Sequence, residues 1–513
     1  MKKKNNLIFL ILSVLFVIPA ILALFHSGFF LTDDGNWMVI RFSAFYEALK
    51  NGQFPVRFLF RLNNGYGYPV ADFLYPLFMY IGVPIHVLGF NFVNTIKIIL
   101  GSSLIFSSFF CFLWLKRRFD NFASLVGSIL YLYFPYHLWD VYKRGSVGEV
   151  LALAIVPFML WSIEKGNLIL AGIGYGLLIT AHNTLALLFL PIIFTYQILS
   201  SPMINKKIFL RSLFPLILGL GLSAFFWIPA IYDKQFTIFD TVNISSYSDY
   251  FISLNNYNLL GFIFILGITI SLIFLYKKRD KINIYFLSIT LISLFLIFPF
   301  SDFIWKNIPF VDLIQFPFRF LSLITLSLVY LASSQLAILK GKVKIIIGVL
   351  YLLIIFLSTK DFLKPQNYEN YPDSFYSTNQ DTTTVKNEYM PKWVKEVPTQ
   401  MSKEKIEIIT GEGDISNLVT NGNRYSFNFT ARKNSLIQIN TVYFPGWVLK
   451  IDRKDTPIVY DENGLIRFKI LQGNHKIEAK FTETRIRLLS DAISIGSLIF
   501  ILFLILNKKK KFL

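Results

Sequence analysis

Two adjacent carboxylates stand after the first hydrophobic segment of the chain. Asp33 and Asp34 lie in the stretch Phe30-Leu31-Thr32-Asp33-Asp34-Gly35-Asn36-Trp37, which follows an apolar run over residues 7–24. Carboxylates beside lipid are costly unless they face water, a partner or a substrate. One of them could deprotonate an acceptor hydroxyl as a general base, and the pair could hold a divalent metal ion. The alternative is a solvated turn that orients the segment.

Three arginines are candidates for binding a phosphate group. Arg41 follows Asp34 by seven residues, which is two turns along a continuous helix and near the same face. Arg144 and Arg319 stand at the predicted outer ends of apolar segments, where basic residues run against the usual charge bias. A guanidinium can hold a phosphate through two hydrogen bonds. The alternative for each arginine is an interfacial anchor.

Two other polar residues accompany these candidates. Glu149, five residues after Arg144, could pair with that arginine or satisfy the start of a helix. His182 stands at a tight turn, where a lone histidine is more often hydrogen-bonded than bound to a metal. No metal-ligand spacing of real specificity occurs, and the chain has no P-loop or nucleotide-binding glycine motif, so an ATP-driven pump is not supported.

The composition indicates a polytopic membrane protein. The chain has 513 residues, of which 54% are hydrophobic, more than soluble domains carry. The formal charge of +19 comes from 50 basic and 31 acidic residues. The basic residues cluster in short runs between apolar segments, which is how orientation in a membrane is set, so nucleic-acid binding is not expected. Cys111 is the single cysteine, so no intrachain disulfide can form.

The apolar segments predict about twelve membrane spans. They cover residues 7–24, 95–115, 123–134, 150–163, 168–180, 185–199, 210–231, 259–276, 284–300, 321–339, 343–357 and 489–506. Residues 73–88 are interrupted by two prolines and predict a surface or re-entrant segment. If they do not cross, every second loop carries lysine and arginine, which places both termini in the cytoplasm. The long N-terminal apolar stretch has no clear cleavage site and predicts an uncleaved anchor.

The outer segments are predicted to carry the polar chemistry. Residues 26–72 form the first outer loop, and residues 37–49 have the apolar spacing of a helix along the membrane surface. Residues 1–359 are predicted as the transmembrane domain, residues 360–487 as an extracytoplasmic domain, and residues 488–513 as the last span with a basic cytoplasmic tail. Short alternating stretches predict an all-β, sandwich-like domain from about residue 405, with strands near residues 406–409, 425–429, 437–443, 448–451, 458–460, 466–470 and 477–481.

An acidic motif in the first outer loop of a polytopic chain resembles the C-type glycosyltransferase superfamily (GT-C), such as oligosaccharyltransferases, protein O-mannosyltransferases and lipid A aminoarabinose transferases. More closely, the chain resembles bacterial membrane proteins called 6-pyruvoyl-tetrahydropterin synthase-related and the YfhO-like proteins, although nothing suggests pterin chemistry. The stretches that carry this resemblance are Asp34-Gly35 with Arg41, Gly52-Gln53-Phe54-Pro55-Val56-Arg57, Gly65-Tyr66-Gly67-Tyr68-Pro69, Tyr75-Pro76, Pro135-Tyr136-His137, Arg144-Gly145 with Glu149, His182-Asn183, Gln315-Phe316-Pro317-Phe318-Arg319-Phe320, Asn387-Glu388-Tyr389-Met390-Pro391 and Tyr443-Phe444-Pro445-Gly446-Trp447.

The chain departs from that closer family at two positions. The family tends to carry histidine just before the acidic residue and four residues after it, where this chain has Asp33 and Met38. A catalytic or metal-binding role of either histidine would therefore be missing. Asp33 instead gives the paired acids of other GT-C enzymes.

The resemblance implies a glycosyltransferase that takes a sugar from a polyprenyl-phosphate donor to a cell-envelope glycan, lipid or protein at the outer face of the cell membrane. Asp34 would be the base, and Asp33 a second candidate for catalysis or for a metal. Arg144 and Arg319, with Arg41 as a second choice, would bind the phosphate, and the β domain would help bind the acceptor. Glu149, His182 and His137 are further candidates.

Two other classes of function stay open. A transporter or flippase of envelope lipids would carry charged residues deep in its spans and repeated halves, and the predicted spans are nearly free of charge at mid-depth. A non-catalytic envelope assembly protein with the same fold would be separated from an enzyme only by assays of activity.

Overall fold

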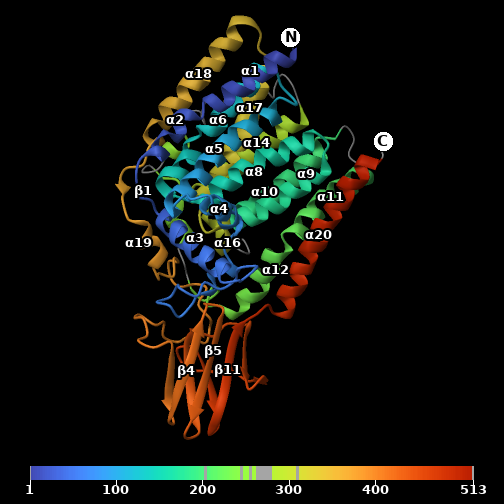
Figure 1. Cartoon of the computed structure of the whole chain (residues 1–513). Coiled ribbons are helices and arrows are strands. Elements are labelled where there is room, and N and C mark those ends of the chain that lie inside the picture. The colour runs from blue at the N-terminus through green and yellow to red at the C-terminus, as the bar shows by residue number, and fades with distance from the viewer. Residues whose placement is uncertain are drawn as a thin grey trace. The chain divides into compact units, whose positions relative to one another are not determined.

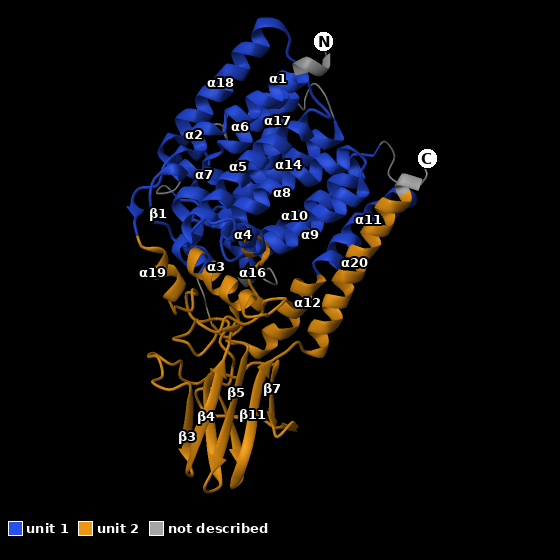
Figure 2. Cartoon of the chain, in the orientation of Figure 1, with its two compact units in different colours: residues 1–38, 80–223, 245–370 blue, residues 39–79, 224–244, 371–513 orange. Residues whose placement is uncertain are grey.

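The structure is a computed structural model that describes residues 2–201, 205–242, 246–253, 257–261, 280–307 and 311–510. Its contacts divide the chain into two compact units (Figure 2). Unit 1 comprises residues 1–38, 80–223 and 245–370, and unit 2 comprises residues 39–79, 224–244 and 371–513. The domain boundaries expected from sequence, before residues 360 and 488, stay a prediction.

Unit 1 is a bundle of apolar helices (Figure 1). Its helices are α1 (Lys2–Leu15), α2 (Ile18–Ile21), α5 (Phe92–Leu115), α6 (Asn121–Leu132), α7 (Pro135–Trp139), α8 (Val147–Glu164), α9 (Leu168–Ala181), α10 (Asn183–Leu199), α11 (Lys206–Leu222), α14 (Lys281–Leu296), α15 (Asp302–Trp305), α16 (Val311–Ile314), α17 (Leu321–Ile338) and α18 (Gly341–Thr359), with most of α4 (Leu77–Val87). A two-stranded ribbon joins β1 (Phe29–Phe30) to β2 (Tyr368–Glu369).

Helix starts in unit 1 are set by polar side chains at the N-cap. The side chains of Asn91, Asp120, Asn167 and Asp280 accept hydrogen bonds from backbone N–H groups in the first turns of α5, α6, α9 and α14. Such caps satisfy N–H groups that have no partner within the helix. α5 packs against α6 and α8, α8 against α9, and α17 against α6 and α14.

Small residues let α9 approach α11 closely. A Cβ on Gly219 would lie 2.2 Å from the Cβ of Tyr175 and 2.9 Å from the carbonyl oxygen of Gly172. Gly172 and Gly176 have the four-residue spacing that brings membrane helices into backbone contact. This contact explains why the glycines stand on these faces.

The predicted count of twelve spans is not confirmed. In the part of the chain that is described, six helices are long and apolar enough to cross a membrane, or up to eight if each of two bent helix pairs is one span. The segments predicted near α6, α9 and α10 form helices of 12, 14 and 17 residues. α4 has 11 residues and is also too short for that test. Most of the span predicted at residues 259–276 lies outside the described residues.

Unit 2 contains the C-terminal β-sheet domain, most of α3 (Gly35–Lys50), and the helices α12 (Ala224–Asp233), α19 (Asp373–Thr378) and α20 (Arg485–Lys510). One antiparallel sheet has the strand order β3-β6-β10-β9 and the other β4-β5-β11-β7-β8. The hydroxyls of Tyr425 and Thr441, 2.9 Å apart and buried, join the two sheets. The strands are β3 (Ile406–Thr410), β4 (Gly413–Thr420), β5 (Arg424–Ala431), β6 (Ser435–Val442), β7 (Trp447–Ile451), β8 (Lys454–Thr456), β9 (Val459–Tyr460), β10 (Leu465–Ile470) and β11 (Gly473–Phe481).

The predicted β-rich region is confirmed, and the seven predicted strands are all present. The sequence did not predict β4 and β8. Both lie at an edge of the five-stranded sheet, and their side chains are mostly exposed. An edge strand of this kind lacks the alternation of apolar and polar residues from which the other strands were predicted.

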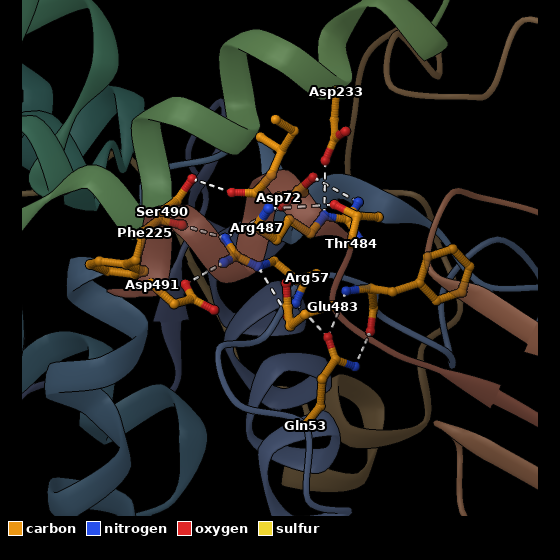
Figure 3. A network of polar contacts seen from close by, with 12 residues as sticks. Gln53, Arg57, Asp72, Phe225, Asp233, Glu483, Thr484, Arg487, Ser490 and Asp491 are labelled. Atoms are coloured by element: carbon orange, nitrogen blue, oxygen red, sulfur yellow. Dashed lines mark hydrogen bonds and ion pairs between the residues drawn. The ribbon is translucent and has the colours of Figure 1, made fainter. Parts of the chain in front are cut away.

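Buried ion pairs connect four segments of unit 2 that are distant in sequence (Figure 3). Arg487 on α20 lies 3.2 Å from Asp72 and 2.8 Å from Asp233 of α12, and its Nη1 donates to the carbonyl oxygen of Pro445. Arg57 contacts Asp72 at 3.5 Å and Asp491 at 3.0 Å. Arg57, Asp72, Asp233 and Arg487 are at most 2% exposed. This network fixes α12, α20 and the loop after α3 to one another.

Candidate functional site

The acidic turn of unit 1 is held by backbone hydrogen bonds to the segment after α7. The N–H of Asp33 donates to the carbonyl of Lys143 at 3.1 Å, and the N–H of Asp34 donates to the carbonyl of Arg144 at 2.8 Å. Thr32 Oγ1 accepts from the N–H of Gly35 at 3.0 Å and starts α3. Residues more than a hundred positions apart are therefore in direct contact.

Gly145 is required at this contact. Its φ is +67°, and a Cβ would lie 2.5 Å from Thr32 Oγ1 and 2.8 Å from the nitrogen of Gly35. An L-residue would be strained in this backbone conformation and would also push the acidic turn away. The glycine ends a π-helical turn, Asp140–Arg144, and so directs both the carbonyl and the side chain of Arg144 toward the turn.

The two acids differ in their surroundings. Asp33 is 52% exposed and forms a surface ion pair with Lys143 at 3.2 Å. Asp34 is 31% exposed, and its Oδ2 lies 3.8 Å from Nη2 of Arg144. Asp34 therefore faces the arginine while remaining open to a solute, as a proton acceptor must.

Arg144 and Arg319 meet on a single carboxylate oxygen. Glu149 Oε1 lies 2.7 Å from Nη1 of Arg144 and 2.9 Å from Nε of Arg319, and its Oε2 accepts from the hydroxyl of Tyr136 at 2.8 Å. Glu149 is fully buried and the arginines are 5–6% exposed. Nη1 of Arg319 also donates to Thr184 Oγ1 and to the carbonyl of Ile314.

In each arginine, one terminal nitrogen, Nη2, has few protein partners. Nη2 of Arg144 has its nearest carboxylate, Asp34, at 3.8 Å. Within the described part of the chain, no hydrogen bond is formed by Nη2 of Arg319. The Arg144 guanidinium lies 5.6 Å from the ring centre of Phe316 and 5.2 Å from that of Phe318, and Arg319 lies 4.7 Å from Phe316. Aromatic faces hold a guanidinium in place without occupying its N–H groups.

Asp140 is a second buried carboxyl group in this cluster. Its Oδ1 lies 2.8 Å from Nη1 of Arg144, and its Oδ2 has no hydrogen-bond partner among the described residues. Burial, and then the negative charge of Glu149, raise the pKa of Asp140 well above its ordinary value. Asp140 therefore binds a proton more readily than an ordinary aspartate does.

Both candidate histidines are buried and neutral. Burial lowers the pKa of His182 to about 3 and that of His137 to about 4. Nδ1 of His182 accepts from the N–H of Leu185 at the start of α10, so Nε2 carries the proton, 3.5 Å from Glu149 Oε1. Nδ1 of His137 donates to the carbonyl of Tyr131 at 3.1 Å. His182 thus contacts the carboxylate that joins the two arginines, whereas His137 has only a backbone partner in the described residues.

Arg41 belongs to unit 2, where its side chain is hydrogen-bonded to another segment of the protein. Its Nε and Nη2 donate to the side chain and the carbonyl of Thr383, a residue with a φ of +60°. Arg41 is 3% exposed. A phosphate-binding role for Arg41 stays a prediction and gains no support from these contacts. Across the described residues, no group of three or more histidine, cysteine, aspartate or glutamate side chains is arranged to hold a metal ion.

Asp140, Tyr136 and Thr184 were not among the site residues predicted from the sequence, although Tyr136 lies in a stretch that carries the family resemblance. Asp140 precedes Arg144 by four residues, the spacing of a helical ion pair, and this is the signal that could have found it. The roles of Tyr136 and Thr184 depend on contacts between helices that no local pattern encodes.

No family model matches the chain, and no curated protein matches its sequence. In structure, the chain is similar to the arabinofuranosyltransferase AftD from mycobacteria, with a TM-score of 0.50 and 13% identity over 73% of this chain and 28% of that one. It is also similar to the oligosaccharyltransferase of Archaeoglobus fulgidus in its apo form, with a TM-score of 0.44 and 14% identity over 74% of this chain and 60% of that one.

The chain spans less than two thirds of the length of either protein. At such low identity the likeness to AftD shows the fold alone, and the weaker likeness to the oligosaccharyltransferase carries no argument. The chain therefore has a fold similar to that of AftD, with apolar helices and a C-terminal β-sheet domain. The closer likeness to YfhO-like and 6-pyruvoyl-tetrahydropterin synthase-related proteins is not confirmed.

Proposed function

We propose that this protein is an integral membrane glycosyltransferase that takes a sugar from a polyprenyl-phosphate donor and transfers it to a cell-envelope acceptor at the outer face of the membrane. The observation that carries the proposal is the meeting of an accessible carboxylate, Asp34, with Arg144, which shares Glu149 with Arg319. The AftD-like fold supports a glycosyltransferase in general terms. A polytopic membrane location fits the apolar helices.

In this proposal Asp34 is the general base. It takes the proton of the acceptor hydroxyl as the oxygen attacks the anomeric carbon, and the bond from that carbon to the phosphate oxygen breaks. The phosphate leaves with the bonding electrons. Because this is a single direct displacement from the face opposite the phosphate, the anomeric configuration inverts. Because phosphate leaves readily without protonation, no general acid is needed. A positioned base typically contributes on the order of 10²- to 10⁴-fold in rate.

The arginines hold the departing phosphate. Nη2 of Arg144 and Nη2 of Arg319 are the donors with the fewest protein partners, and Glu149 holds each guanidinium through a different nitrogen, Nη1 of Arg144 and Nε of Arg319. Donors that are already oriented toward the place where charge develops stabilise a transition state without reorganising. Asp33, exposed and paired with Lys143, is a less suitable base.

The test compares two neighbouring substitutions in the purified full chain. Asp34→Asn keeps the shape of the side chain but removes the proton acceptor, and Asp33→Asn makes the same change one residue away. Radiolabelled polyprenyl-phosphate pentoses and hexoses serve as donors, and envelope extract serves as acceptor. Asp34→Asn should lower transfer on the order of 10²-fold or more, whereas Asp33→Asn should change it less than about tenfold.

Three results contradict the proposal. Full transfer by Asp34→Asn removes the base assignment. No transfer from any donor by the unmodified protein, with lipid translocation that Asp34→Asn leaves intact, supports the flippase alternative. Envelope defects that Asp34→Asn fully complements in cells support the non-catalytic assembly role.

A further inference from the structure

Unit 2 carries five aromatic side chains in consecutive contact, here called the aromatic row. The ring centres are 6.1 Å apart for Tyr232 and Phe236, 6.4 Å for Phe236 and Trp393, 5.7 Å for Trp393 and Tyr443, and 5.4 Å for Tyr443 and Tyr460. Trp393 also lies 5.5 Å from Tyr460, so the last three rings contact one another. The two ends are open to solvent, with Tyr232 44% exposed and Tyr460 42% exposed. The three inner rings are partly exposed.

Backbone hydrogen bonds fix the segments that carry the row. The N–H of Lys392 donates to the carbonyl of Phe236 at 3.0 Å, which places Trp393 beside the end of α12. Nε1 of Trp393 donates to the carbonyl of Tyr443 at 3.0 Å. The N–H of Tyr443 in turn donates to the carbonyl of Gly464 at 2.7 Å. The rings are thus held in place before any ligand arrives, which lowers the entropic cost of binding.

A glycine allows the central ring to pack against the turn between β9 and β10. Gly464 has a φ of +72°, and a Cβ there would lie 2.6 Å from Cγ2 of Val394 and 3.1 Å from Cδ1 of Trp393. This close approach presses residues 393–394 onto the turn. The arrangement fixes Trp393 on the turn while leaving the ring partly exposed.

The rings of the row are more exposed than the rings of an aromatic core. The stacked pair Tyr425 and Trp447 in the same unit is 2% and 5% exposed, as expected of rings that serve packing. Rings whose role is packing alone are expected to be buried, whereas every ring of the row is at least partly exposed. Contiguous exposed aromatic surface in a folded protein marks a binding site.

Charged groups border the row at its β9–β10 end. Lys395 and Glu462 form an ion pair of 3.1 Å with both side chains more than 60% exposed, and their backbones are joined by a 2.7 Å hydrogen bond. Asp461 pairs with Arg467 at 2.8 Å. An apolar stripe with a hydrogen-bonding rim suits a ligand that is itself apolar on one face and polar at its edge.

We propose that the aromatic row binds a saccharide chain. A sugar ring presents C–H bonds on its face, which pack on an aromatic π face, and hydroxyls at its edge, which reach the charged rim. Tyr232 alone, at the end of an apolar helix, would also fit an aromatic belt at the membrane interface. The exposed ion pair beside Tyr460 favours the saccharide, because its charged groups can bind hydroxyls. Assigning this saccharide as the acceptor rests on the proposed function.

The experiment measures binding of defined pentose and hexose oligosaccharides to the full chain in detergent, in the Asp34→Asn background so that no transfer occurs. Tyr460→Ala and Tyr232→Ala remove an exposed ring at either end of the row. Tyr371→Ala is the matched control, because Tyr371 is 41% exposed and stacks on Phe375 at 4.2 Å outside the row. Loss of one stacked ring should weaken binding about tenfold, and the control should leave it unchanged.

Each outcome decides between the alternatives. Binding that both row variants weaken and the control does not supports the proposal. Failure of every oligosaccharide to bind, or equal binding by both row variants and the unchanged chain, overturns it. If the row variants leave oligosaccharide binding intact but reduce incorporation into lipid nanodiscs, the row is an interfacial belt. Oligosaccharide binding without any glycosyl transfer by the unmodified chain supports the saccharide site and contradicts the proposed function. Asp34-dependent transfer without oligosaccharide binding supports the proposed function and contradicts the saccharide site.

Discussion

Replacing one oxygen tests the charge arrangement of the candidate site. Glu149→Gln removes the negative charge between Arg144 and Arg319 and keeps the volume of the side chain. In the native chain Glu149 Oε1 lies 2.7 Å from one guanidinium and 2.9 Å from the other, and all three groups are buried. Removing one partner of a buried ion pair typically costs about 3–5 kcal/mol, because a charge is left without compensation.

The two arginines differ in the neighbours that can balance their charge in the Glu149→Gln variant. Arg144 keeps two carboxyl neighbours, Asp140 at 2.8 Å and Asp34 at 3.8 Å. Arg319 keeps only neutral acceptors, namely Thr184 Oγ1, the carbonyl of Ile314 and the side chain of Gln315. Two unit charges about 4 Å apart at an effective dielectric constant near 20 interact by about 4 kcal/mol, which agrees with the mutational range. We therefore expect Glu149→Gln to lower the free energy of unfolding by about 3–5 kcal/mol, mainly through Arg319.

Double variants provide the assay for this reasoning. Unfolding of the full chain in mixed micelles with increasing dodecyl sulfate, followed by tryptophan fluorescence, gives the free-energy differences. Glu149→Gln with Arg319→Gln should recover about half of the loss or more, because the stranded charge is gone. Glu149→Gln with Arg144→Gln should recover less, because Arg319 stays uncompensated. Equal recovery by the two, or a loss below about 1 kcal/mol for Glu149→Gln alone, would refute the reasoning.

Two further substitutions have matched controls in the chain, and a third prediction concerns the effect of pH on stability. Gly145→Ala should lower the free energy of unfolding by more than the about 1–2 kcal/mol that a left-handed backbone costs an L-residue, and should reduce transfer. Gly166→Ala is the control, because Gly166 has a φ of +72° and nothing within 4 Å of its Cβ, so only the backbone cost is expected. Similar unfolding profiles for the two variants would contradict this. Arg487→Leu should lower the free energy of unfolding by about 3–5 kcal/mol and the exposed Arg424→Leu by at most about 1 kcal/mol, and equal losses would count against the buried network. Burial lowers the pKa of Lys405 from 10.5 to about 8. Between pH 8 and pH 10.5 the unfolded chain therefore binds more protons than the folded chain, and the free energy of unfolding should rise with pH. A Lys405→Met chain that shows the same rise would exclude this lysine as its source.

Asp34, Arg144 and Arg319 were selected from the sequence because each stands where a charged group next to an apolar segment needs a partner. In the structure Asp34 lies 3.8 Å from Arg144, and Glu149 joins Arg144 to Arg319. Their catalytic and phosphate-binding roles stay predictions. The strands of the β-sheet domain were predictable for a similar reason, because residues that alternate between a core and solvent leave a period of two in the sequence.

Other features depend on contacts between distant segments and left no local signal. Arg487 and Asp72 are 415 residues apart in sequence, and neither lies in a motif that suggests an ion pair. The number of spans was inferred from apolar segments and checked by charge alternation between loops. The segments predicted near α6, α9 and α10, residues 123–134, 168–180 and 185–199, were already short, and the helices have 12, 14 and 17 residues, fewer than the about 20 that a span needs.

The pairing of both arginines with Glu149 constrains how an anionic donor would be held. In the cluster, Lys143 and the two arginines face the carboxyl groups of Asp33, Asp34, Asp140 and Glu149, so basic groups are not in excess over acidic groups. A phosphate would therefore be attracted by directed N–H groups on fixed guanidiniums rather than by an excess of positive charge. Exposed charges are screened by salt over about 8–10 Å, whereas buried pairs are screened much less. Donor affinity in the proposed enzyme should accordingly change little between low and physiological salt, and a steep salt dependence would place the phosphate on exposed lysines such as Lys143 instead.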